Sequence, residues 1–155
     1  MDESIRSRIR HIFLSPRPNF ALMTASELLG MPFRELKNEI ADGSIVAVST
    51  GMGQRLTREE MIVLAMRMWE QSVIEEALGD EAAAILPEAM RLVELRARIP
   101  RYQRDMLRVM AEWQGTSVDD VLARELEGVA CTYSEELAAA VPGFSAAMRW
   151  PGVEG

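Results

Sequence analysis

Two short segments that each end on a glycine, followed by a segment suited to a hairpin, constrain this chain most. Residues 24–30 predict a short helix ending at Gly30, and residues 31–43 predict a second helix ending at Gly43. Glycine suits these ends because it readily takes the left-handed conformation that closes a helix. Residues 44–56 then predict two strands joined by a glycine-rich turn. The predicted order is therefore helix, tight turn, helix and hairpin.

The starts of the two helices also have signals. Thr24 and Glu27 have the spacing of a capping box, in which each side chain pairs with the backbone N–H of the other residue. Pro32 suits the first turn of the second helix, where its missing N–H has no helical partner to lose. The residues of the second helix that share one face, and are predicted to be buried, are Phe33, Leu36 and Ile40.

This stretch resembles the excisionase-type, or MerR-like, helix-turn-helix domain. The residues that carry the resemblance are Thr24, Glu27, Leu28, Leu29, Gly30, Leu36, Ile40, Gly43, Ile45, Arg55, Leu56 and residues 57–60. The resemblance implies a winged helix-turn-helix DNA-binding domain over residues 15–60, whose second helix enters a major groove and whose hairpin is the wing. It implies DNA contacts by Arg34, Lys37, Asn38 and Arg55.

Two features depart from that family. Its wing is usually rich in arginine, whereas residues 49–54 carry no charge. Glu35, Glu39 and Asp42 also place carboxylates on the helix that would face DNA, and carboxylates repel phosphate. A small helical domain that uses the same fold for protein contacts is therefore the alternative.

Composition limits the function classes. The 155 residues suffice for one domain or two small ones, with 48% hydrophobic residues to form a core. A single cysteine, Cys131, and a single histidine, His11, provide neither a disulfide framework nor a zinc site. No P-loop, dinucleotide-binding, GxSxG or HExxH pattern is present. We therefore expect no enzyme, no cofactor and no metal. No apolar run has the length of a membrane span and no leader opens the chain, which predicts a cytoplasmic protein without a membrane partner.

The net charge of −7 is unevenly distributed. Residues 1–60 carry 8 basic and 8 acidic side chains, residues 61–110 carry 7 and 8, and residues 111–155 carry 2 and 8. The one basic cluster is Arg96, Arg98, Arg101, Arg104 and Arg108. Contact with phosphate needs local positive charge rather than a positive total, so this cluster is a second candidate DNA site.

The basic cluster lies in a second patterned segment. Residues 95–99 alternate apolar and basic side chains, which is the period of a strand. Residues 101–114 form an amphipathic helical pattern that Gly115 ends, and residues 116–119 form a capping pattern. Residues 118–126 then continue a helical apolar face. The predicted order is strand, helix, glycine turn and capped helix.

This order resembles the ribbon-helix-helix family. The matching residues are Arg98, Ile99, Pro100, Leu107, Ala111, Gly115, Thr116, Ser117, Val121, Leu122 and Leu126. The resemblance implies a homodimer in which the strands of two chains pair and enter the major groove. Arg96 and Arg98 would then meet base edges, Arg101 would contact the DNA backbone, and the helix start at Thr116 and Ser117 would hold a phosphate.

A helical interpretation of the same region remains open. Residues 84–99 also fit a helix that begins near Pro87, with Met90, Val93 and Ala97 on one face. In that case Arg96 and Arg98 are surface residues of a helical bundle. The sequence does not decide between the two.

Two further segments complete the chain. Residues 61–94 predict connecting helices, with one helix over residues 61–78 that is also a candidate for dimerisation. Residues 131–155 predict an acidic amphipathic tail that Pro142 divides into two short helices. The tail residues predicted to bind a partner protein are Leu137, Val141, Phe144, Met148 and Trp150. The alternative is that they pack back on the same chain.

The predicted fold class is mainly α with a small β-hairpin wing: an N-terminal winged helix-turn-helix domain and a helical C-terminal domain with a ribbon-helix-helix-like segment over residues 95–130. DNA-reading modules joined to an acidic tail resemble a bacterial type II antitoxin. That resemblance implies double-stranded DNA and a toxin protein, often a nuclease, as partners, with repression of its own operon. The alternatives are a stand-alone MerR- or excisionase-like regulator without a toxin, and an adaptor that binds proteins and not DNA.

Overall fold

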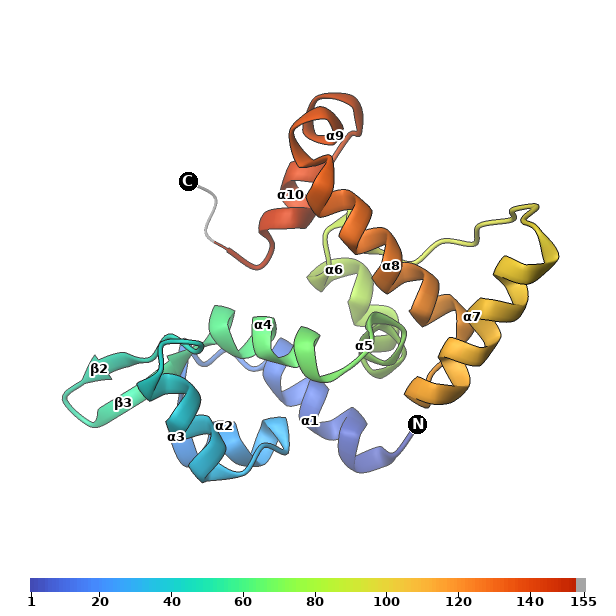
Figure 1. Cartoon of the computed structure of the whole chain (residues 1–155). Helices are drawn as coiled ribbons and strands as arrows, with labels where there is room; N and C mark the ends of the chain where they lie inside the picture. The colour runs from blue at the N-terminus through green and yellow to red at the C-terminus, as the bar shows by residue number, and fades with distance from the viewer. Residues whose placement is uncertain (153–155) are drawn as a thin grey trace. The chain divides into compact units, whose positions relative to one another are not determined.

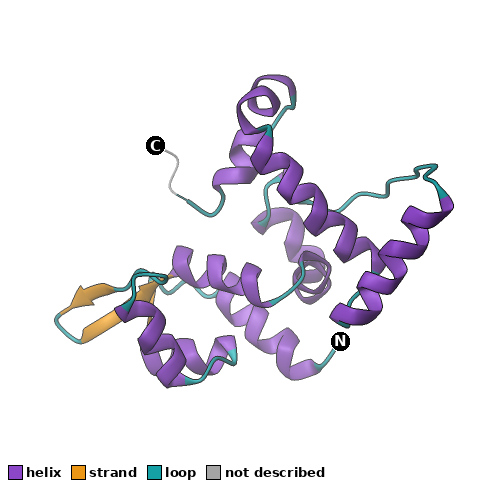
Figure 2. Cartoon of the chain, in the orientation of Figure 1, coloured by secondary structure: helices purple, strands orange, loops and turns teal. Residues whose placement is uncertain are grey.

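The computed structural model describes residues 1–152, which divide into two compact units (Figure 1). Unit 1 is built from residues 1–85 together with Pro151 and Gly152, and unit 2 from residues 86–150. Helices dominate both units, and a small three-stranded antiparallel sheet lies in unit 1 (Figure 2). This confirms the prediction of a mainly α fold with a small β element.

Unit 1 alternates short helices with short strands. Its helices are α1 (Glu3–Leu14), α2 (Leu22–Leu29), α3 (Phe33–Ala41), α4 (Arg58–Met68), α5 (Gln71–Leu78) and α6 (Ala82–Ile85), with a 3-10 turn η1 (Gly79–Glu81). Its strands are β1 (Asn19–Ala21), β2 (Val48–Thr50) and β3 (Gly53–Thr57), in the spatial order β1-β3-β2. Leu56 of β3 pairs with Phe20 of β1, and both side chains are buried. The sheet therefore contributes directly to the core of unit 1.

Helix α1 was not predicted from the sequence. Asp2 caps its start by accepting a 2.7 Å hydrogen bond from the backbone N–H of Ser4. Ile9, Ile12 and Phe13, at spacings of three and one, are fully buried. They pack α1 against α5, α4 and α2. The compact unit therefore extends on both sides of the residues 15–60 assigned to the winged domain.

The ends of α2 are partly as predicted. Gly30 and Gly43 both have positive φ, 68° and 85°, which confirms them as left-handed residues after α2 and α3. The predicted cap at Thr24 is wrong, because α2 begins at Leu22 after Ala21 and has no side-chain cap. Strand β1 leads directly into α2, so the chain turns two residues before Thr24.

The hairpin and the helices after it also differ in detail from the prediction. The first strand was predicted from residue 44, but β2 begins at Val48, and β1 was not predicted at all. The single helix predicted over residues 61–78 is two helices, because the backbone of Trp69 is extended. The apolar faces of α4 and α5, which include Leu64 and Ile74, are buried within unit 1 and pack against α1. The face proposed for dimerisation is therefore occupied by the same chain.

Unit 2 has longer helices and an irregular segment. Its elements are the 3-10 turn η2 (Glu88–Met90) and the helices α7 (Arg101–Gln114), α8 (Val118–Thr132), α9 (Ser134–Ala140) and α10 (Phe144–Arg149). Residues 91–100 are all exposed and form neither helix nor strand. The helix over residues 84–99 is wrong, because α6 ends at Ile85 and only the 3-10 turn η2 lies between it and α7. Pro87 and Pro100 each disfavour a helical conformation for the residue before them, Leu86 and Ile99. The strand over residues 95–99 is also absent from the single chain, which offers it no neighbouring strand.

Helices α7 and α8 pack against each other and are joined by a short turn. Gly115, with φ 63°, ends α7 as predicted, and the Ser117 hydroxyl caps α8. Leu107, Ala111 and Val121 form a buried cluster between the two helices. This cluster is the only core that joins α7 to α8 within residues 86–150.

The tail folds back on its own unit. Pro142 and Gly143 separate α9 from α10, which confirms the predicted division. Helix α10 packs against η2, and a Cβ atom at Gly143 would lie 2.9 Å from the Cβ of Ala89. The tail is therefore partly docked, which is the alternative that the sequence left open.

Candidate nucleic-acid interface

The first candidate surface is the exposed side of α3 in unit 1. Leu36 is fully buried and fixes the orientation of this helix, while Arg34, Lys37 and Asn38 are exposed. The Lys37 ammonium lies 5.7 Å from the centre of the Phe33 ring, in a cation–π contact. The structure therefore brings three of the four predicted DNA residues of this unit together on one helix.

Carboxylates share this surface. Glu35 and Asp42 are exposed and Glu39 is half-buried. Hydrogen bonds from Ser44, first from its side chain and then from its backbone, lower the pKa of Asp42. This carboxylate therefore stays ionised at the end of α3, where it opposes phosphate binding.

The hairpin adds little positive charge to α3. Arg55 is half-buried, and its Nε donates a hydrogen bond to Oδ1 of Asn19 on β1. Residues 49–54 at the hairpin tip are exposed and uncharged, and Met52 there is 81% exposed. Arg55 therefore helps to join β3 to β1.

The sequence reasoning did not single out Arg17, which is exposed between two prolines just before β1. The backbone N–H of Arg58 donates a 3.0 Å hydrogen bond to the carbonyl of Pro18, which anchors this loop at the start of α4. The signal in the sequence that could have pointed to Arg17 is its position between two prolines, which favour an exposed loop. Arg17 is one more exposed cation of unit 1 that a phosphate could meet.

The second candidate surface is the segment between η2 and α7, drawn as loop in Figure 2. Arg96 is almost fully exposed and lies 3.9 Å from the Glu94 carboxylate. The side chains of Arg98 and Arg101 are exposed and make no hydrogen bond or ion pair among the described residues. Three predicted DNA residues thus lie together on one accessible stretch.

The backbone of this segment is exposed and pairs with no other part of the described chain. Within the part of the chain that the structure describes, the backbone of residues 93–99 makes no hydrogen bond. Val93 and Leu95 are 86% and 70% exposed, which is unusual for large apolar side chains. They alternate with Glu94, Arg96 and Arg98, so an extended conformation would put the apolar and charged groups on opposite faces.

The start of α8 is not an open anion site. The hydroxyls of Thr116 and Ser117 donate hydrogen bonds of 3.1 and 2.6 Å to Oδ2 of Asp120. The backbone N–H of Asp120 in turn donates to the Ser117 hydroxyl at 3.1 Å. Asp119 adds a second carboxylate in this turn. Both predicted phosphate-binding hydroxyls are therefore engaged by a carboxylate of the same helix.

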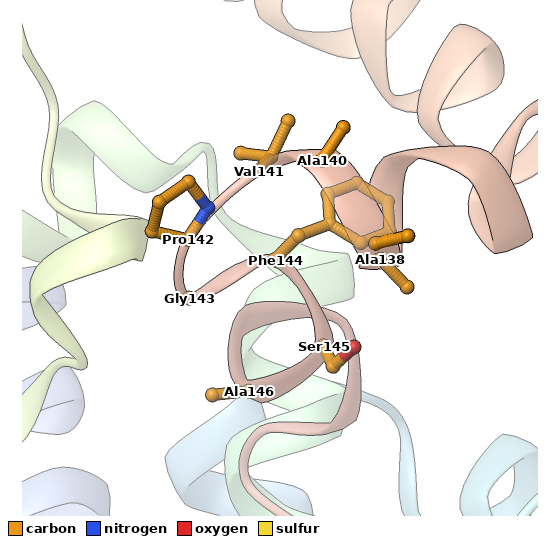
Figure 3. A pocket seen from close by; sticks show the side chains of 9 residues that line it. Ala138, Ala140, Val141, Pro142, Gly143, Phe144, Ser145 and Ala146 are labelled. Carbon is orange, nitrogen blue, oxygen red and sulfur yellow. The ribbon is translucent and has the colours of Figure 1, made fainter.

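A shallow hollow of about 290 Å³ lies where α9 meets α10 (Figure 3). It is lined by residues 138–146, which include Val141 and Phe144 of the predicted partner-binding set. Ser145 supplies the only side-chain hydroxyl of the lining, which contains no charged side chain. Leu137, Phe144 and Trp150 are half-buried, whereas Val141 and Met148 remain exposed. The apolar set is thus divided between packing within the chain and the surface.

Comparisons with family models, curated proteins and solved structures find no match to this chain. Among the residues described, no helix is long and apolar enough to cross a membrane. No group of three or more metal-ligating side chains occurs within residues 1–152.

Proposed function

We propose that this chain is a DNA-binding transcriptional regulator that acts as a homodimer. The observation that carries the proposal is the exposed segment 93–99, whose backbone is unpaired and whose arginines alternate with apolar side chains. It stands directly before α7, Gly115 and α8, in the order expected for a ribbon-helix-helix protein. Unpaired backbone groups favour pairing with another strand, and a second copy supplies an identical one.

Pairing of this kind would sort the side chains of the segment. Val93, Leu95 and Ile99 would share the face that is covered by helices, and Arg96 and Arg98 would share the outer face. A two-stranded ribbon fits the major groove, where the planar fork of arginine can donate to O6 and N7 of guanine. Arg101, exposed at the start of α7, would add a contact to the DNA backbone.

Unit 1 has a secondary role in this proposal. We assign α2, α3 and the β2–β3 hairpin to a winged helix-turn-helix, with Arg34, Lys37 and Asn38 as contacts of α3. The neighbouring carboxylates and the uncharged hairpin tip weaken its attraction for phosphate. Arg96 and Arg98 should therefore contribute more to DNA affinity than Arg34 and Lys37. The same weakness favours a protein-binding role for unit 1 if it does not contact DNA.

Fluorescence anisotropy on duplex from the region upstream of its own coding sequence tests this function. An unrelated duplex serves as competitor. The double variant Arg96→Ala with Arg98→Ala should lose at least about tenfold in specific affinity, since one good bidentate contact contributes about 1–3 kcal/mol. Arg34→Ala with Lys37→Ala should lose less. Arg67→Ala with Arg149→Ala removes the same charge elsewhere and is the matched control.

The outcomes separate the candidate functions. Equal losses in all three double variants would mean that only general charge matters, which contradicts specific reading by Arg96 and Arg98. Absence of binding to any duplex at low salt would reject the DNA-binding proposal and favour the protein-binding adaptor.

The narrower proposal is that the regulator is an antitoxin whose α9–α10 region binds a toxin protein. Val141 and Met148 there are exposed apolar residues that a partner would cover. Co-expression with the small open reading frame beside its own gene tests this part. A complex that Val141→Asp with Met148→Asp disrupts would support it. If the neighbour forms no complex and its toxicity is not relieved, the stand-alone regulator remains.

A further inference from the structure

Helix α7 carries an apolar stripe that nothing in the described chain covers. Its members are Tyr102, Met106, Val109 and Trp113, all exposed, with Trp113 at 81% and Tyr102 at 68%. Successive residues of a helix are rotated by about 100°, so spacings of four, three and four place these side chains within a stripe about 60° wide. Large apolar groups gathered in this way mark a contact surface.

The stripe is distinct from the other two sides of α7. Leu107 and Ala111 form the side that packs against Val121 of α8. The basic side carries Arg101, Arg104 and Arg108. Neither the packing within unit 2 nor the proposed DNA contacts account for the stripe.

We infer that the stripe is the contact surface for α7 of a second copy of this chain, with the two helices antiparallel. Alternating spacings of four and three are those of residues between two paired helices. An antiparallel arrangement centred on the stripe brings Tyr102 beside Trp113 of the second copy, and Met106 beside its Val109. The contact is isologous, because the same residues serve on both sides of a two-fold axis.

The charges along one edge of the stripe favour this occupant. Arg101, Asp105, Arg108 and Glu112 follow one another there with alternating sign. The antiparallel arrangement places Arg101 two positions from Glu112 of the second copy and Asp105 two positions from its Arg108. It also brings Asp105 near Glu112 and Arg108 near its own counterpart, whereas a parallel arrangement would set every charge beside its like. Arg104 of the same helix also pairs with Asp105, at 2.7 Å. A surface whose charges complement its own copy is the pattern expected of a homo-oligomer.

The exposed area suits a reversible contact. An aromatic side chain buries about 150–250 Å², so the four exposed groups offer about 500 Å² on each copy and a pair covers about 1,000 Å², near the lower limit for a specific interface. This contact uses neither residues 93–99 nor DNA. If the segments 93–99 also pair, the two contacts together link dimers into larger assemblies.

Sedimentation velocity of the full chain over a concentration series tests the inference. Trp113→Glu should weaken self-association at least about tenfold, because a buried charge opposes the contact. Met52→Glu, at an equally exposed apolar residue of unit 1, should leave it unchanged. Circular dichroism should report an unchanged helix content in both variants. If wild type and Trp113→Glu sediment alike, the inference is overturned, and the stripe would bind a different partner.

Charge reversal tests the direction of the helices. Arg101→Glu alone and Glu112→Arg alone should each weaken association, since each places like charges face to face. The double variant restores the opposite charges and should recover association. Failure of this recovery would contradict the antiparallel arrangement.

Ala97→Pro separates this inference from the proposed function, because proline removes a backbone N–H that a paired strand needs. If only Trp113→Glu weakens self-association, the chain associates through α7 and the segments 93–99 do not pair. If only Ala97→Pro weakens it, the segments pair and the α7 contact is absent.

Discussion

The two units of this molecule treat their apolar residues in opposite ways. Among the residues that the structure describes, 18 of the buried hydrophobic residues lie in unit 1 and 4 in unit 2. Of the exposed large hydrophobic residues, 6 lie in unit 1 and 13 in unit 2. Because burial of apolar surface is the main favourable term in folding, unit 1 has the core of an independent domain. Unit 2 has apolar surface that a second molecule would cover.

The two units also differ in how their paired helices bury apolar side chains. In unit 1, α4 and α5 bury their apolar faces against α1 of the same chain. In unit 2, the cluster between α7 and α8 consists, among the described residues, of the buried Leu107, Ala111 and Val121, with Met110 and Val118 partly buried against it. The first arrangement supports a stable scaffold, and the second favours assembly, as our proposals for residues 93–99 and for α7 require.

The largest effect is expected in the core of unit 1. Phe13→Ala removes a fully buried aromatic ring and should lower the free energy of unfolding by about 3–5 kcal/mol. Urea titration followed by circular dichroism measures it. Met52→Ala, at an exposed position of the same unit, should change the free energy by less than about 0.5 kcal/mol. If both variants unfold alike, unit 1 does not have the core described and the contrast between the units is lost.

A smaller loss is expected at the turn between α2 and α3. A Cβ atom at Gly30 would lie 2.5 Å from an Arg8 guanidinium nitrogen, and φ there is 68°. Gly30→Ala should therefore destabilise unit 1 by about 1–2 kcal/mol. Gly51→Ala, with open space and no positive φ, should be close to neutral in the same titration. Equal stability of the two variants would contradict the close packing of α1 on this turn.

In unit 2, a loss of stability at the lower end of this range is expected at the cap of α8. Ser117→Ala removes the hydroxyl that accepts from the backbone N–H of Asp120 and should cost about 1 kcal/mol. Ser117→Thr keeps a hydroxyl and should cost much less.

Thermal unfolding of unit 2 should also depend on protein concentration, whereas that of unit 1 should not. Concentration-independent unfolding of both units would break the comparison.

The smallest effect concerns pH and unit 1. Arg10 and Glu81 pair at 2.8 Å, and the side-chain hydrogen bond from Arg10 is the main cause that lowers the pKa of Glu81. Because the pKa of Glu81 is lower in the folded state, the pair stabilises the fold at pH values above the ordinary pKa of 4.5. This stabilisation is lost as the pH falls through the pKa of the folded state. The stability difference between wild type and Glu81→Gln should therefore shrink below pH 4.5. Because Glu81 is exposed and Arg10 is only half-buried, solvent screens the pair, and a large difference would contradict this description.

Glycine and proline signals in the sequence predicted several helix ends correctly. Gly30, Gly43 and Gly115 end helices because each takes a positive φ there, and Pro142 divides the tail because it interrupts a helix. Arg34, Lys37 and Asn38 lie off the buried face of α3, and all three are exposed. These features depend on backbone preferences of a few neighbouring residues, which the sequence carries directly.

Features that depend on distant contacts were missed. The burial of Ile9 and Ile12 in α1 depends on α4 and α5, which lie far along the chain. Thr24 does not cap α2 because strand pairing of β1 with β3 determines where α2 starts. The engagement of Thr116 and Ser117 by Asp120 required side-chain geometry. For residues 95–99, conformation depends on what the segment contacts, which one sequence does not contain.

Hydrogen exchange of the backbone amides of residues 93–99, measured by mass spectrometry, shows whether this segment pairs with that of a second copy. In the single chain these amides make no hydrogen bond within the described residues and should exchange as fast as in a free peptide. We predict that exchange slows by at least about tenfold at concentrations where the chain is dimeric, and that Ala97→Pro abolishes this protection. Fast exchange of these amides in a chain that is shown to be dimeric would contradict the account.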